Sequence, residues 1–370
     1  MRTAIIHYWL VGMRGGEKVL EALCRLFPKA DIYTHVYDPS AVCDVFHKHT
    51  VRTTFIGKLP FARKCYQYYL PLMPMALEQL DMRGYDLVIS SESGPAKGVL
   101  TDAQTPHICY CHTPMRYLWD MYQGYLEERG PLTAAAMRLL TPRLRQWDVL
   151  SSMRVDHFVA NSRTVAARIE KHYRREALVI NPPVDVAAFA PEDGIFPTPE
   201  KDAPYLFFGQ LVGYKRADLA VRACTATNRP LLVIGDGPFK KSLQAEAGPT
   251  VRFAGWLEAE ALKKEILHCK ALIFPGEEDF GMVPVEVQAA GRPVIAFRAG
   301  GVLETVKENV SGLLFTEQTV ESLIDALDRF EQSADTFDPA AINAHVQAFS
   351  PERFNTAFME LVTAAMRQRS

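Results

Sequence analysis

The stretch FPGEEDFGMVPVEVQAAGRPV, residues 274–294, contains the end of one expected strand, a loop, a short helix and the start of the next strand. Pro284 is expected to begin the helix, because an early helical position needs no amide hydrogen, and Gly291 is expected to end it. The free amides of Gly281, Met282 and Val283 would then point out of the helix N-terminus, at the carboxyl edge of a parallel strand. This arrangement is typical of α/β sheets that bind an anion such as a diphosphate.

Two carboxylates bracket this helix N-terminus. Glu286 is expected in the first helical turn, where it would repel a diphosphate, so we expect it to hold the hydroxyls of a ribose instead. Glu278 lies eight residues earlier in the loop, next to Asp279 and Phe280, and would reach a second set of hydroxyls. The pattern predicts a pocket for a sugar nucleotide. In the alternative interpretation, Glu286 only complements the helix dipole and residues 277–279 form a solvated acidic loop.

Short apolar runs, each closed by Gly, Ser, Asn or Pro and followed by a helical pattern, recur along the chain. Strands are expected at residues 3–7, 86–89, 107–110, 157–160, 205–208, 231–234, 271–274 and 293–297. Buried strands that alternate with helices predict parallel α/β sheets with both faces covered. Two Rossmann-like sheets, rather than one, fit this length.

The chain of 370 residues is too long for one compact core, so two domains of about 150 to 200 residues are expected. The segment Asn181–Lys201 carries five prolines and little periodic apolar pattern, which is typical of a linker. The expected domains are residues 1–184 and 185–350, the second of which contains the expected sugar-nucleotide pocket. Residues 351–370 are expected to form a last helix that packs back on the first domain.

Composition limits the functional classes. Hydrophobic residues make up 48% and charged residues 23%, as in folded soluble proteins. The net charge of -2 gives no electrostatic reason to bind nucleic acid. Seven scattered cysteines are expected to be reduced core thiols, although Cys109 and Cys111, on one face of a strand, could form half of a metal site. With no secretory signal and no long apolar run, a cytoplasmic protein is expected.

A second phosphate site is expected in FFGQLVGYKRADLAV, residues 207–221. Lys215 and Arg216 stand at the opening of a helix, where the helix dipole disfavours cations, so an anionic ligand would explain them. Farther along, Gly235 and Gly237 form a sharp turn that is equally consistent with a plain connection. Gly255 and Trp256 would form a wall for a nucleobase, or Trp256 would belong to the core.

The N-terminal half offers two further candidates. Gly15 and Gly16 precede a helix expected to begin near Glu17, so their amides would face a diphosphate, unless they only form a strand-to-helix turn. His112 follows the expected strand ICYC and should lie at the carboxyl edge of its sheet, where active sites of such folds collect. A buried structural histidine is the alternative.

The motifs GQLVGYKR, VIGDGP, FAGWL, PGEEDFGMVPVEVQAAGRPVIA, RAGGVLETV and SGLLF, in this order, closely resemble the C-terminal half of the family 4 retaining glycosyltransferases. The E-x7-E element of that family matches Glu278 and Glu286, and its phosphate lysine matches Lys215. HYWLVGMRGGEKVLEAL and ICYCHTPMRYLWD resemble its N-terminal half. One departure is clear, because the family usually has an arginine where this chain has Gln210. The diphosphate charge must then be met by Lys215, with Arg216 or Arg14.

The resemblance implies a GT-B fold, in which two Rossmann-like domains face a central cleft. It also implies transfer with retention of configuration, without a cofactor, and with Glu278, His112 and Lys215 as the catalytic candidates. No D-x-D motif appears in strand context, so a metal is not required. The phrases HYWLVGMRGGEKVLE, ISSESGPAKGV and CHTPMRYLWDMY resemble O-antigen and exopolysaccharide mannosyltransferases that use GDP-mannose.

The acceptor implied by the resemblance is a glycan or a polyprenyl-diphosphate-linked glycan, as in lipopolysaccharide and exopolysaccharide synthesis. Residues 55–80 mix basic and aromatic side chains and are interpreted as a contact with a membrane surface, or as a core helix with a basic edge. Three other functions stay open: a transferase that uses a UDP-sugar, a GT-B epimerase or hydrolase of nucleotide sugars, and a non-catalytic sugar-nucleotide sensor.

Overall fold

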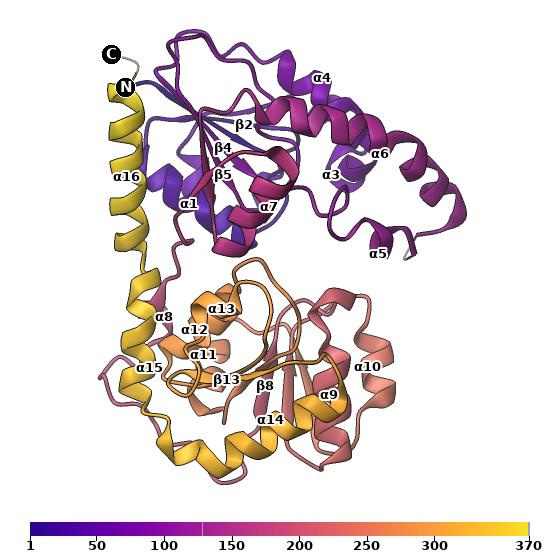
Figure 1. Cartoon of the computed structure of the whole chain (residues 1–370), viewed down its shortest axis with the longest axis vertical. Coiled ribbons are helices and arrows are strands. Elements are labelled where there is room, and N and C mark those ends of the chain that lie inside the picture. Colours follow the sequence, from indigo (N-terminus) through magenta and orange to yellow (C-terminus); the bar gives the residue numbers. More distant parts are fainter. Residues whose placement is uncertain (128, 369–370) are drawn as a thin grey trace. The chain divides into compact units, whose positions relative to one another are not determined.

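The computed structural model describes residues 1–127 and 129–368, and these form two compact units (Figure 1). The first unit contains residues 1–183 and 354–370, and the second contains residues 184–353. Each is a parallel α/β domain, which confirms the predicted fold class. The chain passes between the units at Pro183, inside the proline-rich segment, and again through the C-terminal helix.

The described strands of the first unit form one parallel sheet in the order β3-β2-β1-β4-β5-β6-β7. They are β1 (Thr3–His7), β2 (Asp31–Thr34), β3 (Val51–Thr53), β4 (Leu87–Glu92), β5 (His107–Cys111), β6 (His157–Ala160) and β7 (Ala177–Val179). Every residue of β1, β4 and β5 is buried, as expected for central strands covered on both faces.

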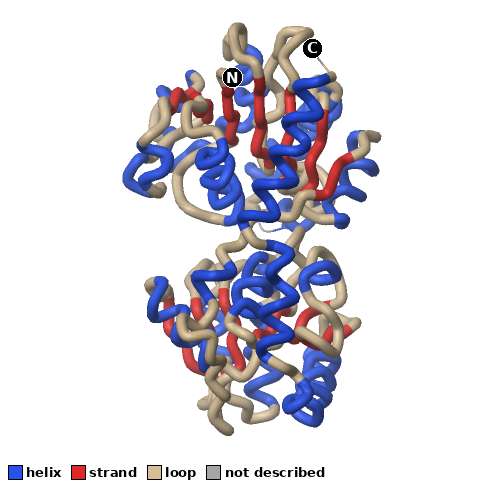
Figure 2. The backbone as a smooth tube through the Cα atoms, turned by 90° about the vertical axis from the view of Figure 1, so that its left-hand side faces the viewer, coloured by secondary structure: helices blue, strands red, loops and turns tan. Residues whose placement is uncertain are grey.

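Eleven helices, some of them single turns, accompany this sheet in the described residues. They are α1 (Gly15–Leu26), η1 (Pro39–Ala41), α2 (Asp44–His47), η2 (Phe55–Lys58), α3 (Ala62–Cys65), η3 (Tyr66–Leu72), α4 (Met73–Glu78), α5 (Tyr122–Glu127), α6 (Pro131–Ser152), α7 (Arg163–Tyr173) and α16 (Pro351–Arg367). In α16, Phe354, Phe358 and Val362 join the same buried cluster as Leu20 and Leu23 of α1. In Figure 2, α16 is the long helix in front of the red strands of this sheet. The C-terminal helix α16 thus packs against α1 of the first unit.

The described strands of the second unit form a parallel sheet in the order β10-β9-β8-β11-β12-β13. They are β8 (Tyr205–Phe208), β9 (Leu231–Ile234), β10 (Val251–Gly255), β11 (Leu272–Phe274), β12 (Val294–Phe297) and β13 (Gly312–Phe315). The helices are α8 (Val186–Phe189), η4 (Gly213–Lys215), α9 (Ala217–Ala226), α10 (Lys240–Glu246), α11 (Ala259–His268), α12 (Met282–Ala289), α13 (Val302–Thr305), α14 (Val320–Ser333), η5 (Ala334–Thr336), α15 (Pro339–Val346) and η6 (Gln347–Phe349). Buried apolar clusters on both faces of this sheet form its core.

All eight expected strands are present, within three residues at each end, but the sequence prediction did not identify β2, β3, β7, β10 or β13 as strands. Three of these, β3, β7 and β10, are edge strands with exposed positions, so their apolar pattern is weak. The proline-rich segment also contains the short helix α8. Within the described residues, no helix has the length and apolar character needed to cross a bilayer.

Candidate functional site

The second sheet has a topological switch point between β8 and β11. These two strands lie side by side and the chain leaves them toward opposite edges of the sheet, so the loops after them diverge, and ligands of open α/β sheets typically bind at such a point. The loops touch at their bases, because a Cβ atom on Gly276 would lie 2.8 Å from the Cα atom of Lys215. The two expected phosphate elements, residues 207–221 and 274–294, therefore meet at this switch point.

Lys215 and Glu278 form an ion pair at this point. The Lys215 Nζ atom lies 2.7 Å from Glu278 Oε1, and the two side chains are 15% and 18% exposed. The sequence predicted both residues in the site but not their contact. A partly buried cation is thus held at the carboxyl edge of the sheet, where an arriving anion can compete with the carboxylate for it.

The helix after β11 begins earlier than the sequence indicated. Gly281 caps it with φ of +82°, a conformation that favours glycine, and α12 starts at Met282 rather than at Pro284. Glu286 consequently lies in the second helical turn and not in the first, and its side chain is 4% exposed. The amides of Met282 and Val283 remain at the helix N-terminus, as expected.

The backbone of Glu278 is fixed by a segment that the site prediction left out. The Gly301 amide donates to the Glu278 carbonyl oxygen at 2.8 Å, and residues 278 and 300 form an isolated parallel bridge. A Cβ atom on Gly300 would clash with that carbonyl, and one on Gly301 would clash with the backbone of Phe280. The paired glycines of RAGGVLETV were the available signal, since adjacent glycines indicate a close backbone approach.

Arg216 and Gln210, the two other phosphate candidates near Lys215, differ in their surroundings. Arg216 adopts φ of +53° at the N-cap of α9, and its guanidinium forms two 3.0 Å hydrogen bonds to Asp218. Gln210 is exposed, next to the end of β8. Arg216 is therefore already bound to an acid on its own helix, whereas Gln210 extends toward solvent.

The remaining donor-side candidates lie on the same edge or next to it. Trp256 follows Gly255 at the end of β10 and is 70% exposed, so the alternative that it belongs to the core is wrong. Asp279 is half-buried, and Glu277 is exposed. Phe280 is buried, with its ring 5.5 Å from that of Phe349, and it anchors the loop to the core of its unit.

The first sheet has its own switch point, between β1 and β4. The helix after β1 starts at Gly15, two residues before the predicted start at Glu17. A Cβ atom on Gly16 would clash with the Tyr8 hydroxyl and would lie 3.6 Å from His112 Nε2. The predicted glycine turn and the predicted histidine are therefore neighbours at one sheet edge.

His112 is held at this edge by two hydrogen bonds. Its amide donates to the Glu92 carbonyl at 2.7 Å, and its Nε2 atom lies 2.9 Å from the Ser91 hydroxyl. Burial, and to a lesser extent His7, lowers the pKa of His112 to about 3. His112 is therefore neutral at physiological pH. The ring is both buried and at the sheet edge, so the structural alternative for this histidine stays open.

A buried network of charged residues, not identified from the sequence, lies next to His112. Lys97 Nζ lies 2.6 Å from Glu92 Oε1 and also contacts Asp148, while Asp148 accepts from Trp119 Nε1 at 2.8 Å and from the Tyr173 hydroxyl at 2.9 Å. Burial opposes the charge on Lys97, but Asp148 and Glu92 outweigh burial and raise the pKa of Lys97. The network joins the end of β4 to the segment 111–120 that carries His112.

The described residues contain no group of three His, Cys, Asp or Glu side chains arranged to hold a metal ion. Cys109 and Cys111 share one face of β5, as expected, and they pack in a buried apolar cluster with Val155, Phe158 and Val165. Their surroundings are those of core thiols, because burial raises the pKa of both.

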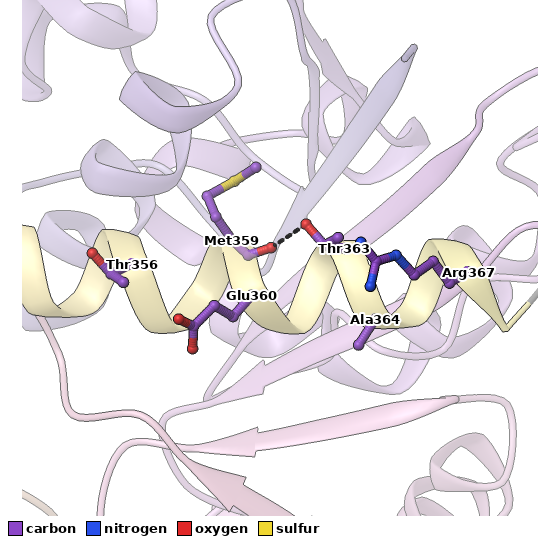
Figure 3. A pocket seen from close by; sticks show the side chains of 6 residues that line it. All are labelled: Thr356, Met359, Glu360, Thr363, Ala364 and Arg367. Atoms are coloured by element: carbon purple, nitrogen blue, oxygen red, sulfur yellow. Dashed lines mark hydrogen bonds between the residues drawn. The ribbon is translucent and has the colours of Figure 1, made fainter.

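A hollow of about 460 Å³ on α16 is unrelated to these edges. All its lining residues belong to that one helix, and the hydrogen bond drawn in Figure 3, from the Thr363 hydroxyl to the Met359 carbonyl at 2.8 Å, is internal to the helix. No residue at the carboxyl edge of either sheet lines it, so each of the two edges is a candidate site of its own unit.

Solved structures share this fold over nearly their whole length. A sucrose-phosphate synthase from Thermosynechococcus elongatus has a TM-score of 0.74 at 18% identity, with 100% of both chains covered. HepE from Anabaena in complex with UDP has a TM-score of 0.71 at 16% identity, covering 98% of this chain and 100% of that one. At these identities the likeness concerns the fold.

Curated relatives match over part of their length. The D-inositol 3-phosphate glycosyltransferase of Streptomyces scabiei is 29% identical over 246 residues, 57% of this chain and 54% of the relative. The GDP-mannose-dependent alpha-mannosyltransferase of Corynebacterium glutamicum is 36% identical over 109 residues, 29% of this chain and 26% of the relative. The chain thus matches the first of these relatives over about half of its length and the second over about a quarter.

Two family models match successive parts of the chain. The model described as Glycosyltransferase Family 4 matches residues 13–188, and the model described as Glycosyl transferases group 1 matches residues 191–344. Together they cover the two parallel-sheet units and leave out only short stretches at the ends and at the linker. The chain belongs to the family 4 glycosyltransferases of GT-B fold.

Proposed function

We propose that the protein is a retaining glycosyltransferase that moves mannose from GDP-mannose to a glycan or a lipid-linked glycan in cell-surface polysaccharide synthesis. The observation that carries the transferase proposal is the Lys215–Glu278 ion pair of 2.7 Å at the switch point of the second sheet. It places a cation and a hydroxyl-binding carboxylate beside the N-terminus of α12. These are the groups that a nucleoside diphosphate sugar requires.

The chemistry follows from what each group can stabilise. As the bond between sugar and diphosphate breaks, negative charge grows on the leaving diphosphate, and Lys215 and the α12 amides stabilise it. Lys215 is paired with Glu278 before a ligand arrives, so the diphosphate takes over the lysine and Glu278 turns to the sugar hydroxyls. Glu286 binds the ribose, and His112 contacts the donor sugar.

The choice of GDP-mannose is supported by the N-terminal phrases and by the 36% identity to a GDP-mannose-dependent relative over 109 residues. The rival donor is a UDP-sugar, since HepE, which has the same fold, binds UDP. The base-facing candidate is Trp256, because an exposed indole offers a flat apolar surface to either base.

A donor screen by thermal shift tests the proposal. A ligand that binds only the folded protein raises its stability by RT ln(1 + [L]/Kd), about 2.7 kcal/mol at a hundredfold excess over Kd. We expect GDP and GDP-mannose to raise the melting temperature more than UDP, ADP and their sugars. Greater stabilisation by UDP compounds would reassign the donor.

Product analysis with the best donor separates the remaining functions. Transfer to an added glycan or polyprenyl-diphosphate glycan supports the transferase. Free sugar or an epimerised nucleotide sugar, formed without an acceptor, would identify the hydrolase or epimerase. Binding without any turnover would identify a sensor.

The proposed membrane contact rests on an exposed basic and aromatic surface in residues 55–80, here named the basic-aromatic surface. It consists of Lys58, Phe61, Arg63, Lys64 and Tyr68, all of them exposed. The segment is a series of short helices rather than one helix, but it buries Ile56, Ala62, Met73 and Ala76 in the core, so the alternative of a core segment with a basic edge stays open. We propose that this surface touches an anionic lipid surface, as a lipid-linked acceptor would require.

Vesicle sedimentation tests the membrane contact. We expect binding to vesicles that contain anionic lipid, loss of binding at high salt, and weaker binding for Phe61→Ser. The matched control is Leu132→Ser, since Leu132 is 88% exposed outside this surface. Equal binding by both variants and the parent, or no binding to anionic vesicles, would refute the contact.

A further inference from the structure

Four buried polar side chains lie one after another in a line at the carboxyl edge of the first sheet, joined by one close electrostatic contact and two hydrogen bonds. Glu17 Oε1 lies 3.6 Å from His7 Nε2, His7 Nδ1 lies 3.1 Å from the Ser91 hydroxyl, and Ser91 Oγ lies 2.9 Å from His112 Nε2. These residues come from α1, β1, β4 and the end of β5, and all are buried. Glu17 also accepts the Arg14 amide through its other oxygen at 3.0 Å, which fixes the carboxylate in place.

The order of protons along this line follows from how many protons each group has. At 3.6 Å the Glu17 carboxylate is too far from His7 Nε2 for a hydrogen bond, and this nitrogen has no hydrogen-bond partner among the described residues, but the nearby negative charge still favours a proton on it. With a single proton on Nε2, His7 offers Nδ1 as an acceptor, and the Ser91 hydroxyl donates to it. Ser91 then has only its lone pairs left for His112, so the proton of His112 must be on Nε2.

We infer that Glu17 acts at a distance as a positioning residue, which through His7 and Ser91 keeps His112 in its Nε2–H tautomer and leaves Nδ1 as a hydrogen-bond acceptor. His112 Nδ1 can then accept a hydrogen bond from a hydroxyl group, but it cannot donate one to a phosphate oxygen. This inference rests on the proposed function for the identity of the hydroxyl, which would belong to the donor sugar.

The neutral state of His112 supports the same conclusion. Burial and His7 keep its pKa at about 3, so a doubly protonated ring that donates from both nitrogens is excluded near neutral pH. A structural role alone would be served by either tautomer, because both keep the hydrogen bond to Ser91. The positioning role requires one of them.

Glu17→Gln provides a near-isosteric test. The Arg14 amide keeps the Gln carbonyl oxygen facing it, so the Gln NH₂ group faces His7 Nε2 and donates to it. Every donor in the line then reverses: His7 protonates on Nδ1, Ser91 donates to His112 Nε2, and the His112 proton moves to Nδ1. Long-range proton–nitrogen NMR of ¹⁵N-histidine protein at pH 8 reads the tautomer directly, with His112 assigned from the signal lost in His112→Gln.

We expect Nε2–H in the parent and Nδ1–H in Glu17→Gln. The control Glu21→Gln, on the same helix but paired with Arg25 at the surface, should leave the tautomer unchanged. Ser91→Ala breaks the line, so adding Glu17→Gln to it should change nothing further at His112. An Nδ1–H tautomer in the parent, which can be measured even if a variant fails to fold, or an unchanged tautomer in a folded Glu17→Gln would overturn the inference.

Kinetics separate this inference from the proposed function. With the donor found by the screen, Glu17→Gln should lower the turnover number about tenfold and leave affinity for the free nucleotide unchanged, because only the sugar contact is altered. A tautomer that switches in a protein that transfers no sugar would refute the proposed function alone. Unchanged turnover together with a switched tautomer would show that the Nδ1 acceptor has no part in transfer.

Discussion

The carboxyl edges of the two sheets are built in opposite ways. In the first unit, Lys97, Glu92 and Asp148 are buried and bonded to one another, and His112 is linked to Ser91 beside them. In the second unit, Lys215 and Glu278 keep part of their surface in solvent and stand beside the helix amides of α12. At the first edge the charged side chains bind one another, whereas at the second edge they remain accessible to an approaching ligand.

The two edges therefore differ in what their charged groups can do. A buried charge network is costly to break, so it holds nearby groups in one geometry. The Lys215–Glu278 pair keeps some contact with solvent and costs less to separate than a fully buried pair, so a charged ligand can exchange with one partner. We therefore expect substitutions in the Lys97 network of the first edge to lower stability, and substitutions of Lys215 or Glu278 at the second edge to lower activity.

The largest expected effect is at Lys97. Lys97→Met leaves Glu92 and Asp148 without their shared cation in a dry interior, and we expect the free energy of unfolding of the first unit to fall by about 3 to 5 kcal/mol. Urea unfolding followed by tryptophan fluorescence measures this. A Trp256→Phe background restricts the signal to Trp9, Trp119 and Trp147 of the first unit.

The matched control is Arg222→Met, which breaks the surface pair between Arg222 and Glu246 in the second unit. We expect it to leave the unfolding of both units nearly unchanged, because exposed pairs contribute little. A Lys97→Met protein as stable as this control would mean that the buried network does not stabilise the first edge.

The next effect is on catalysis. Lys215→Ala removes the cation for the diphosphate and frees the Glu278 carboxylate to repel it, so we expect activity to fall about 10 to 150-fold, the range of one charge-assisted hydrogen bond. The turnover number should fall more than donor affinity, because negative charge grows in the transition state. Steady-state kinetics with the donor from the screen measure both.

Gln210→Arg sharpens the same test, since it restores the arginine usual in the family at an exposed position. We expect it to be tolerated and to recover part of the activity of Lys215→Ala in the double variant. If Lys215→Ala stays within a few-fold of the parent, or the double variant is no better than the single one, then another cation carries the phosphate, and Arg14 and Arg216 are the next to test.

A smaller, ligand-selective effect is expected for the two carboxylates. Glu286→Ala should weaken binding of both the free nucleotide and the nucleotide sugar about tenfold or more, because both carry the ribose. Glu278→Ala should weaken only the nucleotide sugar. Isothermal titration calorimetry measures the affinity of each variant for both ligands. Equal losses of affinity for both ligands in both variants would contradict this division of roles.

The smallest expected effect is that of removing divalent cations. Lys215 and the α12 amides supply the positive charge in our proposal, so EDTA should leave nucleotide affinity and turnover nearly unchanged. A large loss that magnesium or manganese restores would show that the second edge needs a metal to bind the diphosphate.

Some of the site could be predicted because its residues are close in sequence. Glycine, proline and strand spacing in residues 274–294 were enough to predict a strand, a loop and a helix with free N-terminal amides, although proline misled the prediction of where α12 begins. Pro284 is tolerated at the third position of the helix, since amides in the first turn have no partner within the helix. The helix after β1 was likewise placed two residues late.

Other parts of the site depend on contacts between distant residues. The line from Glu17 to His112 spans 95 positions of sequence, and the network around Lys97 joins residues 92 to 173. Nothing local marks Ser91 or Asp148 as partners of these groups, because Ser91 stands in a run of polar residues and Asp148 is an ordinary polar residue between Trp147 and Val149. The order of β1, β4 and β5 in the sheet brings Ser91 to His7 and His112, and the position of α6 brings Asp148 to Lys97.

The sequence by itself determined the fold class, because two series of buried strands that alternate with helices can cover both faces of their sheets only as parallel α/β domains. It also determined which loops carry glycines and charges at the carboxyl edges. The tertiary structure alone decided which of those charges face one another: Lys215 meets Glu278, and His112 meets Ser91. Strand order and register set these pairings, and neither can be read from the local pattern of residues.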